Sequence, residues 1–168
     1  MRWPATATVR FVGTSTLHDF AGELPSQPFV LVISNGAWSA EADVLAGSMA
    51  TGSEGRDRNM HRMLNTNDHP RLRGKVVSAP VPSAAGTNAM LNLKIQNRQF
   101  DLPVRVTDWR ESAEEITFHA AWEVSLKQYG LKPPSVLAVI RVGDIVRIET
   151  DVRASKTNSP APATALRQ

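Results

Sequence analysis

Apolar and polar residues alternate with a period of two along most of this chain. In residues 116–126 the even positions are all apolar and most of the odd positions are polar. A β-strand gives this pattern when one of its faces packs in a core and the other meets water. Similar alternation predicts further strands, of which the last two are weaker candidates, at residues 8–11, 38–44, 91–95, 99–106, 146–153, 29–33 and 76–78.

Short segments that favour turns separate the predicted strands. The clearest turns are Asn35-Gly36, Ala85-Gly86 and 142–144. Strands with one apolar face pair in antiparallel sheets, and a sheet of about eight strands closes into a barrel or folds into a sandwich. Closure removes the exposed edges that favour aggregation. We therefore predict an all-β fold, an antiparallel β-barrel of about eight strands.

One segment departs from the alternation. Residues 58–64 place Met60, Met63 and Leu64 at positions i, i+3 and i+4, which share one face of a helix. The sequence therefore predicts one short helix of about one or two turns. A helix of this length can lie across the mouth of a barrel.

The predicted inward faces differ in size, which bears on whether the barrel is hollow. Ala40 and Ala42 are small, whereas inward positions on other strands are large, as at Phe11, Phe100, Phe118 and Trp122. A barrel of this size is either filled by its own side chains or holds one small ligand. The small residues favour a ligand, but they are also compatible with a bulky tryptophan that packs against them. The sequence leaves both interiors open.

Composition sets the limits of the domain. The 168 residues and the hydrophobic content of 42% fit one globular domain, which we assign to residues 3–154. Residues 155–168 contain a Ser-Pro-Ala-Pro stretch and are predicted to form a disordered C-terminal tail. No run of about 18 or more apolar residues is present, so no membrane-spanning helix is predicted. The net charge of +3 is too small to indicate nucleic acid as a partner.

Several kinds of chemistry are excluded or disfavoured. The chain has no cysteine, which excludes disulfides, thiolate metal sites and cysteine nucleophiles, and its four histidines are scattered, so we expect no metal and no cofactor. The first residues lack the apolar segment of a signal peptide. On this criterion the chain is either cytoplasmic or the processed form of an exported protein.

A catalytic interpretation rests on Ser15, His18 and Asp19, whose side chains could act as a hydrolase triad. These residues are too close in sequence for the usual triad, and no nucleophile-elbow motif is present. We therefore assign no catalytic residue and expect that the protein is not an enzyme. Trp109 ends a predicted strand beside charged residues and is interpreted as a rim residue.

Short motifs along the domain occur in an order that resembles one known family. They are a Ser-x-Leu-His-x-Phe-x-Gly element after the first strand, a Thr…Arg-Asp…Met…Leu…Pro segment, a Leu-x-Ile…Leu-Pro-Val pair, an aromatic-Gly-Leu element and the entry to the last strand. In this chain they lie at residues 15–22, 51–70, 93–104, 124–131 and 142–146. Together they resemble the YceI-like family, lipocalin-like barrels associated with polyisoprenoids and other long-chain lipids.

The resemblance implies a lipocalin-like barrel with a long apolar tunnel, and a location in the periplasm or outside the cell. The implied partner is a polyisoprenoid, an isoprenoid quinone or a fatty-chain lipid, held for carriage, storage or sequestration. The rival hypothesis is an interaction or stress-response protein that has a filled barrel and binds no lipid. Arg73-Gly74 stands where the family tends to have Phe, which leaves the openness of the cavity undecided. The sequence also leaves open whether the barrel forms a homodimer.

The candidate site combines an apolar lining with a polar mouth. Burial of hydrocarbon drives binding in such a site, and methionine adapts well to a flexible chain. The expected lining residues are Phe11, Leu17, Phe20, Trp38, Ala40, Ala42, Met49, Met60, Met63, Leu64, Phe100, Phe118 and Trp122. At the mouth we expect His18, Arg56 and Asp57. Arg56 either meets a polar headgroup or, with Asp57, fixes the loop.

Overall fold

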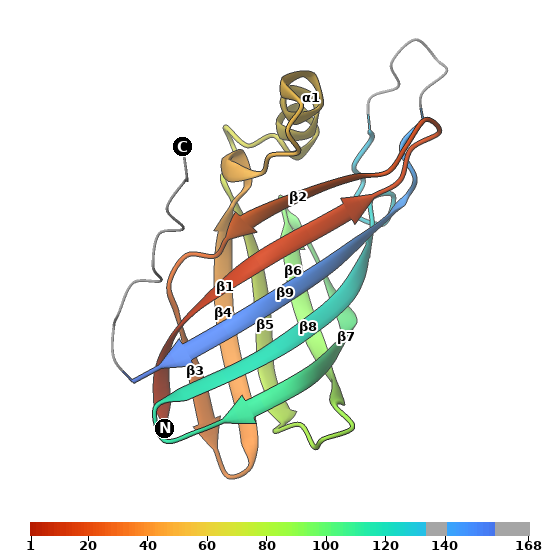
Figure 1. Cartoon of the computed structure of the whole chain (residues 1–168). Helices are drawn as coiled ribbons and strands as arrows, with labels where there is room; N and C mark the ends of the chain where they lie inside the picture. Colours follow the sequence, from red (N-terminus) through yellow and green to blue (C-terminus); the bar gives the residue numbers. More distant parts are fainter. Residues whose placement is uncertain (134–140, 157–168) are drawn as a thin grey trace, which may run out of the picture.

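The computed structural model describes residues 1–133 and 141–156, and these residues form one antiparallel sheet with a helix at one end (Figure 1). The strands are β1 (Arg2–Gly13), β2 (Phe20–Pro25), β3 (Phe29–Ser34), β4 (Ala37–Leu45), β5 (Arg71–Pro80), β6 (Thr87–Ile95), β7 (Arg98–Glu111), β8 (Glu115–Ser125) and β9 (Ile145–Ser155). A short 3-10 helix, η1 (Ala46–Ser48), and the α-helix α1 (Glu54–Leu64) lie between β4 and β5.

The sheet closes on itself through β1 and β9. These strands pair antiparallel from Ala5 opposite Ala154 to Val12 opposite Arg147. On its other side β1 pairs with β3 along its first residues and with β2 from Thr8 onward. Because β2 and β3 share one position in the wall, the strands form a closed barrel of eight positions. The predicted antiparallel β-barrel is confirmed.

Two sequence features explain how the wall turns and curves. Asn35 and Gly36 adopt φ values of 51° and 73°, the left-handed pair that a tight two-residue hairpin between β3 and β4 requires. In β7 the register with β8 shifts between Thr107 and Arg110, and Asp108 has a φ of 56°. This β-bulge reverses the inward and outward alternation for the rest of β7.

The bulge corrects the interpretation of Trp109. The ring of Trp109 turns toward the core and stacks on Phe118 with ring centroids 5.0 Å apart. Trp38 tilts against both rings, at 6.1 Å from Trp109 and 5.4 Å from Phe118. Trp109 is therefore a half-buried member of an aromatic cluster at this end of the barrel, with its ring turned inward. Regular alternation could not reveal this, because one extra residue changes which face a side chain occupies.

Helix α1 is longer than the sequence predicts. It begins after Ser53 and covers 11 residues, because a first turn without apolar residues precedes the predicted segment. Glu54 and Asp57 in that turn favour the helix N-terminus electrostatically. The helix ends at Asn65, whose left-handed φ of 50° lets the chain leave the helix axis. It lies at one end of the barrel (Figure 1).

The C-terminal end of the described chain bears on the domain boundary. Ser155 is the last residue of β9, so the strand includes the first residue of the predicted tail. The rest of that tail falls outside the described residues from position 157 onward. Within the described ranges, no helix is long and apolar enough to span a membrane.

Tyr129, in the segment that follows β8, is buried in the protein interior. Its side chain is among the most buried, and its hydroxyl donates a hydrogen bond to the Leu93 carbonyl oxygen at 2.8 Å. Burial raises the pKa of the Tyr129 phenol to about 12. An exposed tyrosine in the unfolded chain loses its proton near pH 10, as is usual for phenols. The folded state therefore keeps a proton that the unfolded state releases.

This difference predicts alkaline destabilisation. Between about pH 10 and the raised pKa, the free energy of unfolding should fall by about 1.4 kcal/mol per pH unit through this group. Tyr129→Phe removes the titrating hydroxyl, so the free energy of unfolding of this variant should decline less steeply over the same pH range. Urea unfolding of both proteins at a series of alkaline pH values measures the two slopes. Equal slopes would contradict the assignment.

Candidate ligand-binding site

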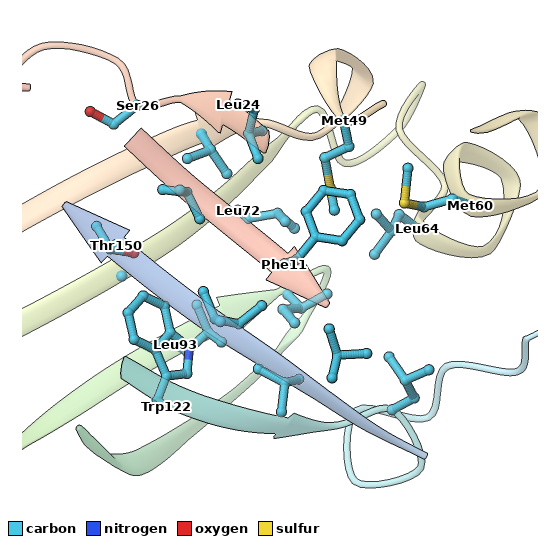
Figure 2. Close-up of a pocket in the computed structure, with 18 of the residues that line it drawn as sticks. Phe11, Leu24, Ser26, Met49, Met60, Leu64, Leu72, Leu93, Trp122 and Thr150 are labelled. Carbon is cyan, nitrogen blue, oxygen red and sulfur yellow. The ribbon is translucent and has the colours of Figure 1, made fainter. Parts of the chain in front are cut away.

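The barrel encloses a cavity of approximately 620 Å³. This volume lies within the range of about 300–1,000 Å³ that is usual for ligand pockets. Every strand and helix α1 contribute to its lining, and most of the lining side chains are apolar. Figure 2 shows Phe11, Leu24, Leu72 and Leu93 around this space, with Met49 and Met60 at one side. The interior is therefore hollow over much of its length.

A patch of small residues contributes to this space. Ala40 and Ala42 face the cavity from β4, and Gly74 lies opposite Ala42 on β5. A Cβ atom at Gly74 would come within 3.2 Å of Leu91 Cδ1, so even alanine would be tight there. The small residues predicted to favour a ligand thus form one continuous surface with a glycine from the next strand.

Arg73 does not enter the cavity. It lies on the outer face of β5, where its Nε donates to Asp43 Oδ1 at 2.8 Å. The hydrogen bond from Arg73 is the main cause that holds the pKa of Asp43 below its usual value. Arg73-Gly74, which stands where the resembled family tends to have Phe, therefore leaves the cavity open. The charged residue points outward and the glycine lines the interior.

The structure brings together all but one of the expected lining residues. The residues that line the cavity as expected are Phe11, Leu17, Phe20, Trp38, Ala40, Ala42, Met49, Met60, Met63, Leu64, Phe118 and Trp122. Leu17 is 64% exposed and lies at the outer edge of the mouth. A role for these residues in holding a ligand remains a prediction.

Phe100 is the exception, and its expected place in the lining is wrong. It packs edge-on against Tyr129, with the ring centroids 4.9 Å apart and the planes at 88°. Alternation along β7 identifies the face of the sheet but not the chain segment that packs on it. Here the segment after β8 supplies Tyr129, which separates Phe100 from the cavity lining.

Several lining residues are missing from the sequence interpretation. Leu24 lies on β2, a short strand that follows a loop and has no clear alternation, so no signal identified it. Leu72, Gly74 and Val76 alternate along β5, and this pattern could have extended the weak strand candidate at residues 76–78. Thr150 lies on the predicted strand at residues 146–153, where alternation places it inward, but alternation assigns no role to its hydroxyl.

The mouth is formed where the β1–β2 loop meets helix α1. Arg56 Nη2 lies 3.2 Å from His18 Nε2, and the Arg56 guanidinium is 5.2 Å from the centre of the Phe20 ring. Asp57 Oδ1 accepts hydrogen bonds from the Thr51 amide at 2.9 Å and the Thr51 hydroxyl at 2.7 Å. Asp57 therefore fixes the loop before the helix, whereas Arg56 and His18 line the cavity entrance.

The opposite end of the barrel is filled by rings. Trp38 and Phe118 are 4% and 6% exposed, and both line the cavity above Trp109. Trp38 is the second residue of β4, beside the β3–β4 hairpin and at the end of the strand away from α1. These aromatic residues form a floor at the end of the cavity away from α1.

The catalytic alternative is not supported by the geometry. The Ser15 hydroxyl donates to the His18 carbonyl oxygen at 2.6 Å, and the His18 ring contacts Arg56 instead of Ser15. The hydroxyl therefore lacks the imidazole contact that would activate it as a nucleophile. Among the described residues, no three His, Cys, Asp or Glu side chains lie close enough together to hold a metal ion.

Comparison with known proteins identifies the family of this barrel. The YceI-like domain family model matches residues 4–154, which cover all the strands except the ends of β1 and β9. The chain belongs to the YceI-like family. The motifs at residues 15–22 and 51–70 of this YceI-like chain form the mouth loop and the helix that lie at the cavity entrance.

Solved structures share the YceI-like fold at low sequence identity. BcnA of Burkholderia cenocepacia superposes with a TM-score of 0.71 at 15% identity, covering 89% of this chain and 96% of BcnA. A polyisoprenoid-binding domain from Saccharophagus degradans, implicated in plant cell wall breakdown, gives 0.67 at 16% identity and covers 91% and 98% of the two chains. The Campylobacter jejuni YceI protein gives 0.61 at 12% identity, with coverage of 79% and 81%. No curated protein matches the sequence.

Proposed function

We propose that this YceI-like barrel binds one long-chain apolar ligand in its interior and carries, stores or sequesters it without chemical change. The candidate ligands are a polyisoprenoid, an isoprenoid quinone and a fatty-chain lipid. The observation that carries the proposal is the apolar cavity of approximately 620 Å³, which a barrel filled by its own side chains would lack. The polyisoprenoid-binding domain from Saccharophagus degradans has a similar fold and supports the same class of ligand.

Burial of hydrocarbon supplies the affinity in this proposal. Each methylene group that leaves water contributes about 0.8 kcal/mol. A chain with a dozen such groups gains roughly 10 kcal/mol, and each further group adds to this gain while the cost of association stays at about 4–15 kcal/mol. Met49, and Met60 and Met63 of α1, line the entrance side of the cavity, where unbranched thioether side chains can adapt to different ligands.

The mouth residues have a separate role in the proposal. The end of the ligand that emerges from the barrel contacts Arg56 and His18, which lie within 3.2 Å of each other. Arg56 supplies a fixed positive charge at this point. Asp57 acts through Thr51 by holding the loop that positions the helix start.

Location in the periplasm or outside the cell is part of the proposal, and cell fractionation tests it.

Mass spectrometry of the intact protein tests the function. Protein purified without detergent should carry a bound long-chain lipid, visible as a mass increment that organic extraction removes. The extracted protein should then take up one molecule of an added isoprenoid or fatty amide. A protein that arrives empty and ignores both ligand classes would support the rival interaction protein that binds no lipid.

A further inference from the structure

Four buried side-chain polar atoms have no hydrogen-bond partner among the described residues; one is Trp3 Nε1, which lies outside the cavity lining, and the other three are on the lining. These three are Trp38 Nε1, Trp122 Nε1 and Thr150 Oγ1, and all three atoms are buried on side chains that line the cavity. Thr150 as a whole is only 7% exposed. A buried polar group without a partner is destabilising, and such groups in a native structure are few. Because Trp38, Trp122 and Thr150 all line the same cavity, a ligand that enters the cavity could supply the missing hydrogen-bond partner.

Trp122 and Thr150 are neighbours across two paired strands. Thr150 on β9 lies opposite Ala120 on β8, and Trp122 is the next inward residue along β8. Diagonal neighbours of this kind have Cα atoms roughly 7–8 Å apart, a span that a long side chain such as tryptophan bridges. On one side Thr150 faces the small Ala120 of β8, and on the other it lies opposite Val9 of β1, so the room beside the hydroxyl is on the Ala120 side.

This pair lies away from the cavity entrance. Figure 2 shows Thr150 and Trp122 on one side of the cavity, whereas Met49, Met60 and Leu64 lie on the other, next to α1. Ser26 also lines the cavity, but its hydroxyl oxygen already accepts a hydrogen bond from the Ala7 amide at 2.9 Å. The unpaired Trp122 and Thr150 atoms therefore lie in the part of the cavity away from its entrance.

The chemistry of the pair selects an uncharged group. The indole of Trp122 can only donate a hydrogen bond, and the Thr150 hydroxyl donates or accepts. Among the described lining residues the charged or ionisable side chains are His18 and Arg56, and both belong to the mouth. An anion beside Thr150 would have no countercharge and would be costly to bury. A carbonyl, amide or hydroxyl group needs none.

We infer that the buried end of the ligand carries an uncharged hydrogen-bonding group, a carbonyl, amide or hydroxyl, and that Thr150 and Trp122 bind it. The inference rests on the proposed function and adds the class and direction of the ligand. The ligand enters with this uncharged polar group first, its hydrocarbon chain extends back toward α1, and the group that ends that chain lies at Arg56 and His18. Trp38 offers a further donor at the floor to a ligand that reaches it.

Matched ligands and variants test this inference. Affinities for hexadecanamide, hexadecanoate and hexadecane are measured by competition against one fluorescent fatty probe. The proteins are wild type, Thr150→Val, Trp122→Phe and the control Thr8→Val, which removes a hydroxyl from the outer face of β1. Valine has nearly the shape of threonine, so Thr150→Val removes the hydroxyl with little change in volume. Its Tm should equal or exceed that of wild type, because the unpaired hydroxyl is gone.

The wild type should prefer the amide to both other ligands. Thr150→Val and Trp122→Phe should each weaken amide binding by roughly threefold to tenfold, the equivalent of one net hydrogen bond, and leave hexadecane binding unchanged. Thr8→Val should match the wild type with every ligand. Equal loss for amide and alkane, or tightest binding of hexadecanoate, would overturn the inference and leave the proposed function intact. Failure of the wild type to bind any of the three would instead contradict the proposed function.

Discussion

Ala42→Phe should weaken binding of a long-chain ligand by about a hundredfold while the protein stays folded. Ala42 faces the cavity opposite Gly74, so a phenyl ring there occupies space that the ligand chain would otherwise fill. Displacing about four methylene groups from the apolar interior costs roughly 3 kcal/mol, which corresponds to about two orders of magnitude in affinity. Because the ring fills existing space, the Tm should stay equal or rise.

A matched substitution outside the barrel separates this effect from a general one. Val77 lies on the outer face of β5 and is 72% exposed, so Val77→Phe adds a ring of the same size without touching the cavity. Probe displacement measures affinity and calorimetry measures Tm for both variants. The account expects wild-type binding for Val77→Phe. Wild-type binding by Ala42→Phe as well would show that the ligand does not use the interior.

Trp38→Ala should produce the largest loss of stability among the cavity residues. The indole is 4% exposed and contacts both Trp109 and Phe118, with which it forms the barrel floor. Removing a buried tryptophan costs about 3–5 kcal/mol through lost burial and the space left behind. For a chain of this size the loss corresponds to a fall in Tm on the order of 10 °C.

Trp38→Phe is the control for the floor. It keeps an aromatic ring against Phe118 and should lose much less stability than the alanine variant. Thermal unfolding followed by circular dichroism compares the two proteins. Removal of the floor also lengthens the cavity, so Trp38→Ala should shift the preferred chain length upward. An unchanged Tm in Trp38→Ala would contradict the packing described for this end.

The alternation of apolar residues was sufficient to predict the barrel and most of its lining. In a one-sided antiparallel strand the period of two determines which side chains point inward, and this holds for β4, β8 and β9. The small residues Ala40 and Ala42 also pointed correctly to open space. The helix was found from the spacing of Met60, Met63 and Leu64, although its polar first turn was not.

The features of the fold and the site that the sequence did not predict depended on information that alternation does not contain. The β-bulge at Asp108 reversed the face of Trp109, and Tyr129, from a segment distant in sequence, covered Phe100. Whether eight inward faces fill a barrel depends on the sum of their volumes in space. For the same reason, the unpaired state of the Thr150 hydroxyl became visible only when its cross-strand neighbours Val9 and Ala120 were in place.

A crystal structure of the protein with its bound lipid tests the central claim most directly. The account predicts continuous density for one extended chain inside the barrel, from Met60 beneath α1 to Thr150 and Trp122. Density for the lipid only on the outer surface, for example beside the exposed Val77 and Met90, would contradict it. So would an interior closed by side chains around Ala40 and Ala42.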